Sequence, residues 1–268
     1  MGVLIVITIS ILHLRMHVIN SNDFPACHDE GSSVIYVDDD TDSVHSSDPA
    51  QLQNSIQREV INSVSWLQDN RLCVAGDKSK LLVIGTKELR SSKLGDGEAL
   101  AIQVDGKEVK ETESEKLLGV VVNNQLTWQQ HLFGDEDNTG LVPQLKQRVG
   151  ILRRLSRHMG RNRLRMFSSG IFYSKLSYCL PVFGNVSGLD KYMITSSRSL
   201  SFTNEDCRKL QVLQNSVNRL LTEARPDTPT ADLITATNTV SIHQMVAYHS
   251  NTPWLWYTRL LNQVSPLT

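Results

Sequence analysis

Four aspartates lie within five positions of the chain, directly after a short apolar segment. They are Asp38, Asp39, Asp40 and Asp42, and the segment is residues 33–37, SVIYV. Carboxylates this close repel one another unless solvent, a proton or a cation relieves the repulsion. Oxygen ligands of this kind suit a hard divalent metal ion. A solvated acidic turn remains the alternative for the cluster taken alone.

Other metal sites receive less support from the sequence. Asp38, Asp40 and Asp42 fit positions 1, 3 and 5 of an EF-hand calcium loop, but Ser43 replaces its glycine and Pro49 its final glutamate. The four cysteines lie far apart, and none of the eight histidines forms a helical pair around a glutamate. The spacing therefore indicates neither zinc nor a disulfide scaffold, and we expect free thiols in a reducing compartment.

The elements around the acidic cluster can be predicted from residue types. Residues 33–37 are rich in β-branched and aromatic side chains and predict a strand, which the DDDTD stretch should end in a turn. Asp48 is a suitable helix N-cap with Pro49 at the first helical position. Apolar residues recur after it at helical spacing, which predicts a helix over residues 49–69.

Further strands are expected beyond this helix. Residues 80–85, KLLVIG, predict a buried strand, and residues 117–122, LLGVVV, predict another. Between them, Asp105-Gly106 separates two alternating segments and predicts a tight hairpin.

The chain begins with an apolar run, MGVLIVITISILHL, which is shorter than the roughly 20 residues that span a bilayer. No basic residue precedes the run and no small-residue cleavage pattern follows it, so a buried strand or helix is expected, with a secretory signal as the alternative. The expected location is intracellular, nuclear or cytoplasmic, with no membrane partner.

Charge divides the chain into an acidic and a basic half. Residues 1–140 hold 11 Lys and Arg against 22 Asp and Glu, whereas residues 141–268 hold 16 against 6. The polar loop 134–140, GDEDNTG, is the expected boundary, and every later apolar pattern is helical. We expect an α+β chain with four parts: an apolar N-terminal segment (1–18), a mixed domain with a β-hairpin region (19–133), a basic helical domain (134–250) and a tail (251–268).

Between Gln144 and Phe167, the basic half carries eight Lys and Arg residues with no acid among them. A helical pair presenting these charges can follow the phosphates of a nucleic acid through counterion release, and a solvated basic face that pairs with the acidic half is the alternative. We expect the nearby aromatics Trp128, Phe167, Phe172, Tyr173 and Tyr178 to belong to the core. The candidate nucleic-acid-binding residues are Lys146, Arg148, Arg153, Arg154, Arg157, Arg161, Arg163 and Arg165.

The segment Tyr36-Val37-Asp38-Asp39 resembles the catalytic Y-x-D-D signature of reverse transcriptases of non-LTR retrotransposons. The resemblance covers about residues 19–250 in the family's order. It also rests on residues 19–25 (INSNDFP), Trp66, Asn70, Leu72, residues 78–83 (KSKLLV), residues 116–120 (KLLGV), Leu126, Trp128, His131 and residues 141–186, which contain YSKLSYCLPVFGNV.

This resemblance implies an RNA-directed DNA polymerase that uses two Mg²⁺ ions. Asp38 and Asp39 would be the catalytic, metal-binding pair, with Asp38 as the direct ligand. The implied partners are an RNA template and a DNA primer, or an RNA–DNA hybrid. The mixed domain would be the C-terminal part of a polymerase palm, and the basic helices a thumb-like domain.

Four residues near this pair receive roles from the same resemblance. Tyr36 and Lys78 would lie near the nucleotide, with a solvated loop lysine as the alternative for Lys78. Asp40 and Asp42 fall outside the signature, so we expect them to be surface charges.

The family's palm also needs an aspartate on an earlier strand and a fingers region. Only 35 residues precede Tyr36, and their acids are Asp23, Asp29 and Glu30, none on a strand of the required kind. We therefore expect a truncated polymerase that is inactive alone. One alternative is a non-catalytic nucleic-acid-binding remnant. Another is a metal-dependent enzyme of unrelated fold, which requires that the strand at 33–37 not form an antiparallel hairpin.

Overall fold

The computed structural model describes residues 3–12, 24, 27–29, 31–36, 39–46, 48–74, 76–85, 100–183 and 203–251. The chain divides into two compact units, Met1–Thr127 and Trp128–Thr268. The first is a mixed α/β unit and the second is helical, so the fold class is α+β. The division lies a few residues before the loop where we expected it, so helix α4 (Gln129–Phe133) belongs to the helical unit.

The first unit is built on a mixed sheet with the strand order β2-β3-β1-β5-β7-β6, and the short β4 also pairs with β1. Every pairing in it is antiparallel except that of β5 with β7. The strands are β1 (Val3–Leu12), β2 (Ser32–Tyr36), β3 (Asp39–Ser46), β4 (Cys73–Val74), β5 (Lys80–Ile84), β6 (Ala101–Val104) and β7 (Lys107–Thr112).

The apolar N-terminal run forms β1, a central strand of this sheet. β1 pairs with β3 on one side and with β5 on the other. Ile7 and Ile9 are fully buried. Ile7 and Ile9 lie on one face of β1 and join the apolar cluster that includes α2, which explains the alternate apolar residues of this segment.

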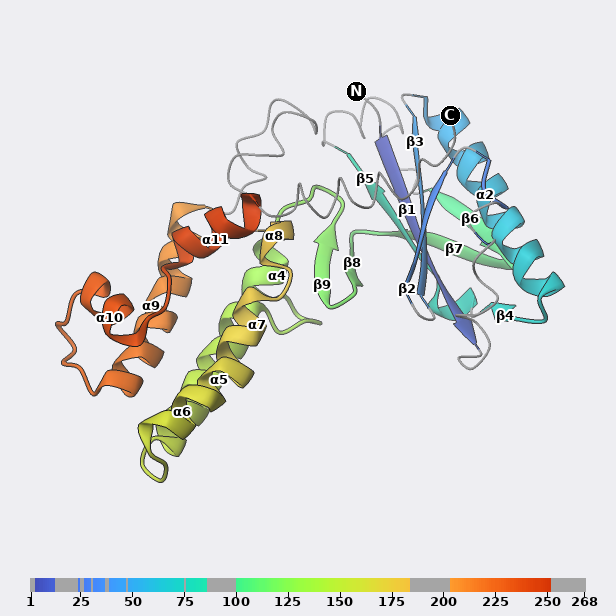
Figure 1. The fold of residues 1–268 in the computed structure, drawn as a ribbon. Coiled ribbons are helices and arrows are strands. Elements are labelled where there is room, and N and C mark those ends of the chain that lie inside the picture. The colour runs from blue at the N-terminus through green and yellow to red at the C-terminus, as the bar shows by residue number, and fades with distance from the viewer. Residues whose placement is uncertain are drawn as a thin grey trace, which may run out of the picture. The chain divides into compact units, whose positions relative to one another are not determined.

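The predicted helix at residues 49–69 is confirmed as α2 (Pro49–Asp69). Its apolar stripe is buried against the sheet, with Leu52, Ile56, Val60 and Leu67 in one cluster with the β1 isoleucines. α2 contacts β1, β3 and β6, and Figure 1 shows it running along one face of the sheet. The side chains of β3 that face α2 are therefore removed from water.

Two hairpins follow α2. The turn of each hairpin contains two consecutive residues with positive φ. The predicted turn at Asp105-Gly106 is confirmed between β6 and β7, with φ of 47° and 77°. The predicted strand at 117–122 is wrong, because this segment contains the turn of a second hairpin. Its strands are β8 (Ser114–Leu117) and β9 (Val120–Asn123). Leu118 and Gly119, with φ of 45° and 83°, reverse the chain between them.

The second unit is a set of helices around one apolar cluster. α5 contacts α6, the π-helical segment η3, α7 and α9, and Figure 1 shows α5 lying along the α6–η3–α7 stretch. The elements are α5 (Leu141–Leu155), α6 (Arg161–Ser168), η3 (Ser169–Tyr173), α7 (Ser174–Ser177), α8 (Leu180–Phe183), α9 (Asn204–Thr222), α10 (Thr230–Thr237) and α11 (Ile242–Asn251).

α9 begins with a capping box. Thr203 Oγ1 accepts a hydrogen bond from the Asp206 backbone N–H, and the Asp206 carboxylate accepts one from the Thr203 N–H. This reciprocal pair satisfies two of the N–H groups that every helix start leaves free. Among the helices that the structure describes, none is long and apolar enough to cross a membrane.

Candidate functional site

The Y-x-D-D segment lies at the end of an antiparallel hairpin. β2 and β3 pair along five residues, and the last pair is Tyr36 opposite Asp39. Val37 and Asp38, which connect these two residues, lie outside the described residues. The alternative of a metal-dependent enzyme of unrelated fold required that the strand at 33–37 not form an antiparallel hairpin. The strand does form one, so this condition is not met.

The strand next to the hairpin offers hydroxyls instead of carboxylates. β1 pairs with β3 in a register that sets Ser10 opposite Asp39 and Thr8 opposite Thr41. The sequence of β1, VLIVITISIL, contains no acid. Of the three acids that precede Tyr36, Asp29 lies in an exposed bend, and Asp23 and Glu30 fall outside the described residues.

Lys78 lies at the same end of the sheet as the hairpin turn. Thr8 of β1 pairs with Thr41 on one side and with Lys80, the first residue of β5, on the other. Lys78 ends the short 3₁₀ helix η2 (Gly76–Lys78), just before β5, and its side chain is exposed. The register thus brings Lys78 and the Tyr36–Asp39 pair to the same end of the sheet, although about 40 positions separate them in the sequence.

Asp40 and Asp42 are not surface charges, so that prediction is wrong. Both lie on β3 and have no exposed surface. Side chains two positions apart on a strand share a face, and the face that holds Asp40, Asp42 and Val44 is covered by α2. The acidic stretch was expected to form a turn after the strand at 33–37. From Asp39 onward it forms strand β3 instead, because β1 and β2 supply pairing partners on both edges of β3.

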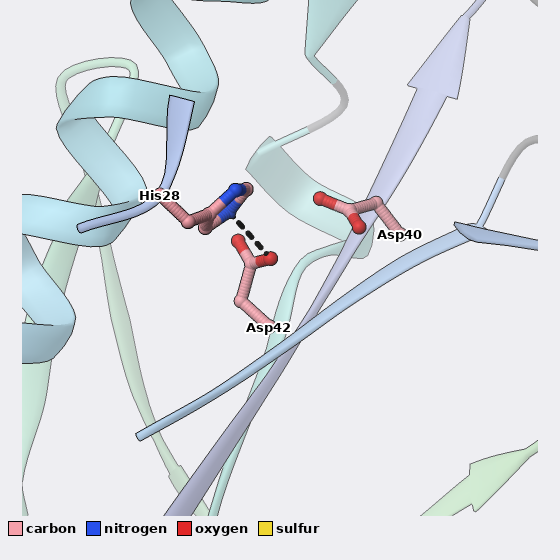
Figure 2. Close-up of side chains that lie close together, drawn as sticks. All are labelled: His28, Asp40 and Asp42. Atoms are coloured by element: carbon pink, nitrogen blue, oxygen red, sulfur yellow. Dashed lines mark ion pairs between the residues drawn. The ribbon is translucent and has the colours of Figure 1, made fainter. Parts of the chain in front are cut away.

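A buried polar cluster forms where β3 meets α2, and Figure 2 shows three of its members. His28 Nε2 lies 2.8 Å from Asp42 Oδ1. Ser63 of α2 donates a hydrogen bond to Asp42 Oδ2 at 2.9 Å, and its Oγ is 3.1 Å from His28 Nε2. Burial alone lowers the pKa of His28, but the hydrogen bond and charge of Asp42, with smaller effects of Asp40 and Glu59, outweigh it and raise the pKa above its usual value.

Asp40 lies beside this pair with a less complete set of partners. Its Oδ1 accepts a hydrogen bond from Ser33 Oγ at 2.7 Å. Its Oδ2 is buried and has no hydrogen-bond partner among the described residues. Desolvation, followed by repulsion from Asp42, raises the pKa of Asp40 to about 7. Two buried carboxylates therefore share one imidazole and need a further positive charge or proton.

Glu59 of α2 holds the loop that carries His28. Its carboxylate accepts hydrogen bonds from the backbone N–H groups of Asp29 at 3.2 Å and Gly31 at 3.1 Å. Cys27 Sγ is 3.4 Å from His28 Nδ1. Burial, then the charges of Asp42 and Asp40, raise the pKa of Cys27 to about 12, so this sulfur is a neutral thiol and a poor nucleophile.

His28, Glu59 and Ser63 belong to this cluster but were not predicted from the sequence. A signal was present for the two α2 residues: Glu59 lies three positions after Ile56, and Ser63 lies three after Val60 and four before Leu67, so both are on the buried stripe. Polar residues on such a stripe need buried partners. His28 carried no local signal of this kind.

The basic helices present most of their predicted cations to solvent. Those exposed are Lys146, Arg153, Arg154, Arg157, Arg161, Arg163 and Arg165. Arg161 is held by Glu223, with its Nη2 2.6 Å from Glu223 Oε2. Arg148 is only partly exposed and donates a hydrogen bond to the backbone oxygen of Ile171, so it joins α5 to η3. The other exposed cations form no ion pair within the described part of the chain.

Two of the predicted core aromatics are exposed. Phe167 and Tyr178 are 47% and 46% exposed, whereas Phe172 is fully buried. Tyr173 lies against the core and donates a hydrogen bond to Asn218 Oδ1 at 2.7 Å. Phe167 borders a groove of about 500 Å³ between α5 and the α6–η3 stretch, with Arg148 and Ile171 also in its lining. The prediction of a core position is therefore wrong for Phe167 and Tyr178.

Neither the known family models, nor the curated proteins, nor the solved structures contain a match to this chain.

Proposed function

We propose that the chain is a palm and thumb-like fragment of an RNA-directed DNA polymerase of the non-LTR retrotransposon class. The observation that carries the proposal is the pairing of Tyr36 with Asp39 at the end of the β2–β3 hairpin. The Y-x-D-D segment would then span the connection between two antiparallel strands, at the end of the sheet. This is the arrangement that a Y-x-D-D signature requires.

The donor chemistry of this hairpin end fits the metal that the proposal needs. Asp38 and Asp39 would hold Mg²⁺, since carboxylate oxygens are the ligands this ion prefers. When bound, two such ions activate the primer 3′-hydroxyl and stabilise the pyrophosphate that leaves. Lys78, exposed at the same edge of the sheet, is suited to pairing with a nucleotide phosphate.

This 268-residue polypeptide should not extend a primer alone. Ser10 lies opposite Asp39 on the neighbouring strand, and β1 contributes no carboxylate to the hairpin end. A two-metal centre needs ligands on both sides of the ions, and one pair of aspartates is a partial set. Primer extension on a primed RNA template, with Mg²⁺ or Mn²⁺, checks this expectation, and any template-directed product contradicts it.

The second candidate function is nucleic-acid binding without metal chemistry. It is favoured by exposed cations of the helical unit that form no ion pair within the described residues, among them Arg153, Arg154 and Arg157, and by the exposed ring of Phe167. Cations with an exposed aromatic side chain suit a backbone-tracking, base-stacking surface. This activity would not depend on Asp38 or Asp39.

Iron-directed cleavage separates the two candidates. The full chain is bound to an RNA template annealed to a 5′-labelled DNA primer, and Fe²⁺ with ascorbate replaces Mg²⁺. Because the hydroxyl radicals form at the bound ion, a polymerase-type site should cut the primer near its 3′ end, and excess Mg²⁺ should suppress the cut.

The Asp38→Asn/Asp39→Asn variant should lose this cut and retain binding of the primed template. Asp77→Asn is the matched control, because Asp77 is an exposed acid of the same unit, paired with Lys107. Binding by the unmodified chain without a localised cut would favour the remnant and reject the metal site at the hairpin.

A further inference from the structure

The buried cluster of His28, Asp40 and Asp42 has the composition of a metal site separate from the hairpin aspartates. We propose that these three residues bind one divalent transition-metal ion, with Zn²⁺ as the expected occupant. The inference does not depend on the proposed polymerase function, because it uses neither Asp38 nor Asp39.

The three side chains converge from two different segments. His28 comes from the loop before β2, and Asp40 and Asp42 come from β3. One ligand atom from each lies within 4.8 Å of the other two. In a tetrahedral zinc site with bonds of about 2.0–2.2 Å, the ligand atoms lie about 3.3–3.6 Å apart, so binding requires side-chain movements of about 1 Å.

Asp40 supplies an independent sign of a missing partner. Its side chain has no exposed surface, and its Oδ2 has no hydrogen-bond partner among the described residues. Figure 2 shows the Asp40 carboxylate directed toward His28 and Asp42. A buried carboxylate oxygen without a donor is costly, and a cation bound between these residues would remove that cost.

The net charge of the cluster is also suited to a divalent ion. Glu59 is the third buried acid nearby, and its carboxylate already accepts hydrogen bonds from the backbone N–H groups of Asp29 and Gly31. This leaves Asp40 and Asp42 against a single imidazole that is 2% exposed. A divalent ion would balance both carboxylates and let His28 bind it as a neutral ligand.

The donor set selects the class of metal. One imidazole nitrogen with two carboxylates suits Zn²⁺, Co²⁺ or Mn²⁺ better than Mg²⁺ or Ca²⁺, which prefer oxygen alone. Nε2 of His28 is the nitrogen near Asp42, whereas Nδ1 is near the Cys27 sulfur. Ser63, which donates to Asp42 Oδ2, would orient that carboxylate from α2 as a supporting hydrogen bond.

Such an ion would join the loop before β2 to the strand that begins at Asp39. Asp40 directly follows the hairpin pair Tyr36–Asp39. The expected role is therefore structural: bound metal should stabilise the first unit and order the start of β3.

Cobalt and zinc binding to the full chain test the proposal. After removal of metal with EDTA, Co²⁺ should bind with one equivalent and give visible d–d absorption, and Zn²⁺ should displace it. His28→Gln and Asp40→Asn should each weaken binding by at least about tenfold. His45→Gln and Asp48→Asn, which change exposed residues of the same unit, should bind like the unmodified chain.

Two further measurements separate this site from the hairpin and from simple misfolding. Asp38→Asn/Asp39→Asn should keep the cobalt spectrum, so its loss in that variant overturns the assignment. X-ray absorption of the zinc-loaded unmodified chain should show a nitrogen and oxygen shell with one imidazole. Sulfur in that shell, or no stoichiometric Co²⁺ or Zn²⁺ binding by the unmodified chain, overturns the proposal without any variant.

Discussion

His28 Nε2 and Asp42 Oδ1 lie 2.8 Å apart in the interior of the first unit, where the two side chains are 2% and 0% exposed. Asp40 is equally buried on the same strand, but its Oδ2 has no hydrogen-bond partner among the described residues, and its carboxylate is repelled by Asp42. The two aspartates therefore have opposite expected contributions to stability, although they are only two positions apart.

Asp40→Asn should stabilise the metal-free chain at pH 8 by about 1 kcal/mol, because it removes a buried charge that is repelled by Asp42 and keeps the acceptor for Ser33. Asp42→Asn should destabilise it by about 1–3 kcal/mol, because it leaves the His28 imidazole without its counter-charge. Urea unfolding of the full chain in EDTA measures both. Equal destabilisation by the two substitutions would contradict the difference between them.

The exposed cations Arg153 and Arg154 at the end of α5, with Arg157 just after it, should set the salt dependence of nucleic-acid binding. Replacing Arg153, Arg154 and Arg157 by Gln should reduce the slope of log K against log salt by about 2 to 3, since each lost phosphate contact contributes about 0.9 on duplex. Arg208→Gln is the control, because Arg208 is already paired with Glu205. A slope that is unchanged in the triple variant would reject these three arginines as the contact surface.

The turn between β8 and β9 is open to a stabilising substitution. Leu118 adopts a positive φ of 45°, which a leucine disfavours and asparagine tolerates. Leu118→Asn should raise the free energy of unfolding by about 0.5–1 kcal/mol. Asp105→Leu, at the matching position of the other hairpin, should lower it by a similar amount. Denaturant unfolding checks both, and a loss of stability in Leu118→Asn would count against this reading of the turn.

The helical unit should lose stability at alkaline pH through Cys207. Burial, with a smaller effect of Asp206, raises the pKa of Cys207 from 9.0 to about 11. The folded state therefore keeps a proton that the unfolded state releases, so this contribution is complete below pH 9 and is lost as the pH rises toward 11.

The loss from Cys207 should be on the order of 2 kcal/mol. Thermal unfolding of the full chain between pH 8 and pH 11 measures it, and Cys207→Ala should flatten the profile relative to the exposed-thiol control Cys73→Ala. A profile of equal slope in Cys207→Ala would show that another group is responsible.

Local pattern was sufficient for several regular elements of this protein. The period of apolar residues predicted α2, the apolar run at 80–85 predicted β5, and Asp105-Gly106 predicted its hairpin. The same rules did not separate β8 from β9, because Leu118-Gly119 is not one of the residue pairs that usually signal such a turn.

The sequence by itself also determined the division into acidic and basic halves and the helical placement of the basic residues. Only the tertiary structure decided which charges are exposed. Asp40 and Asp42 are buried because β3 pairs on both edges and α2 covers the face they share, and His28 joins them from a separate loop. Periodicity is a property of one segment, whereas burial and charge pairing depend on segments that approach only when the chain folds.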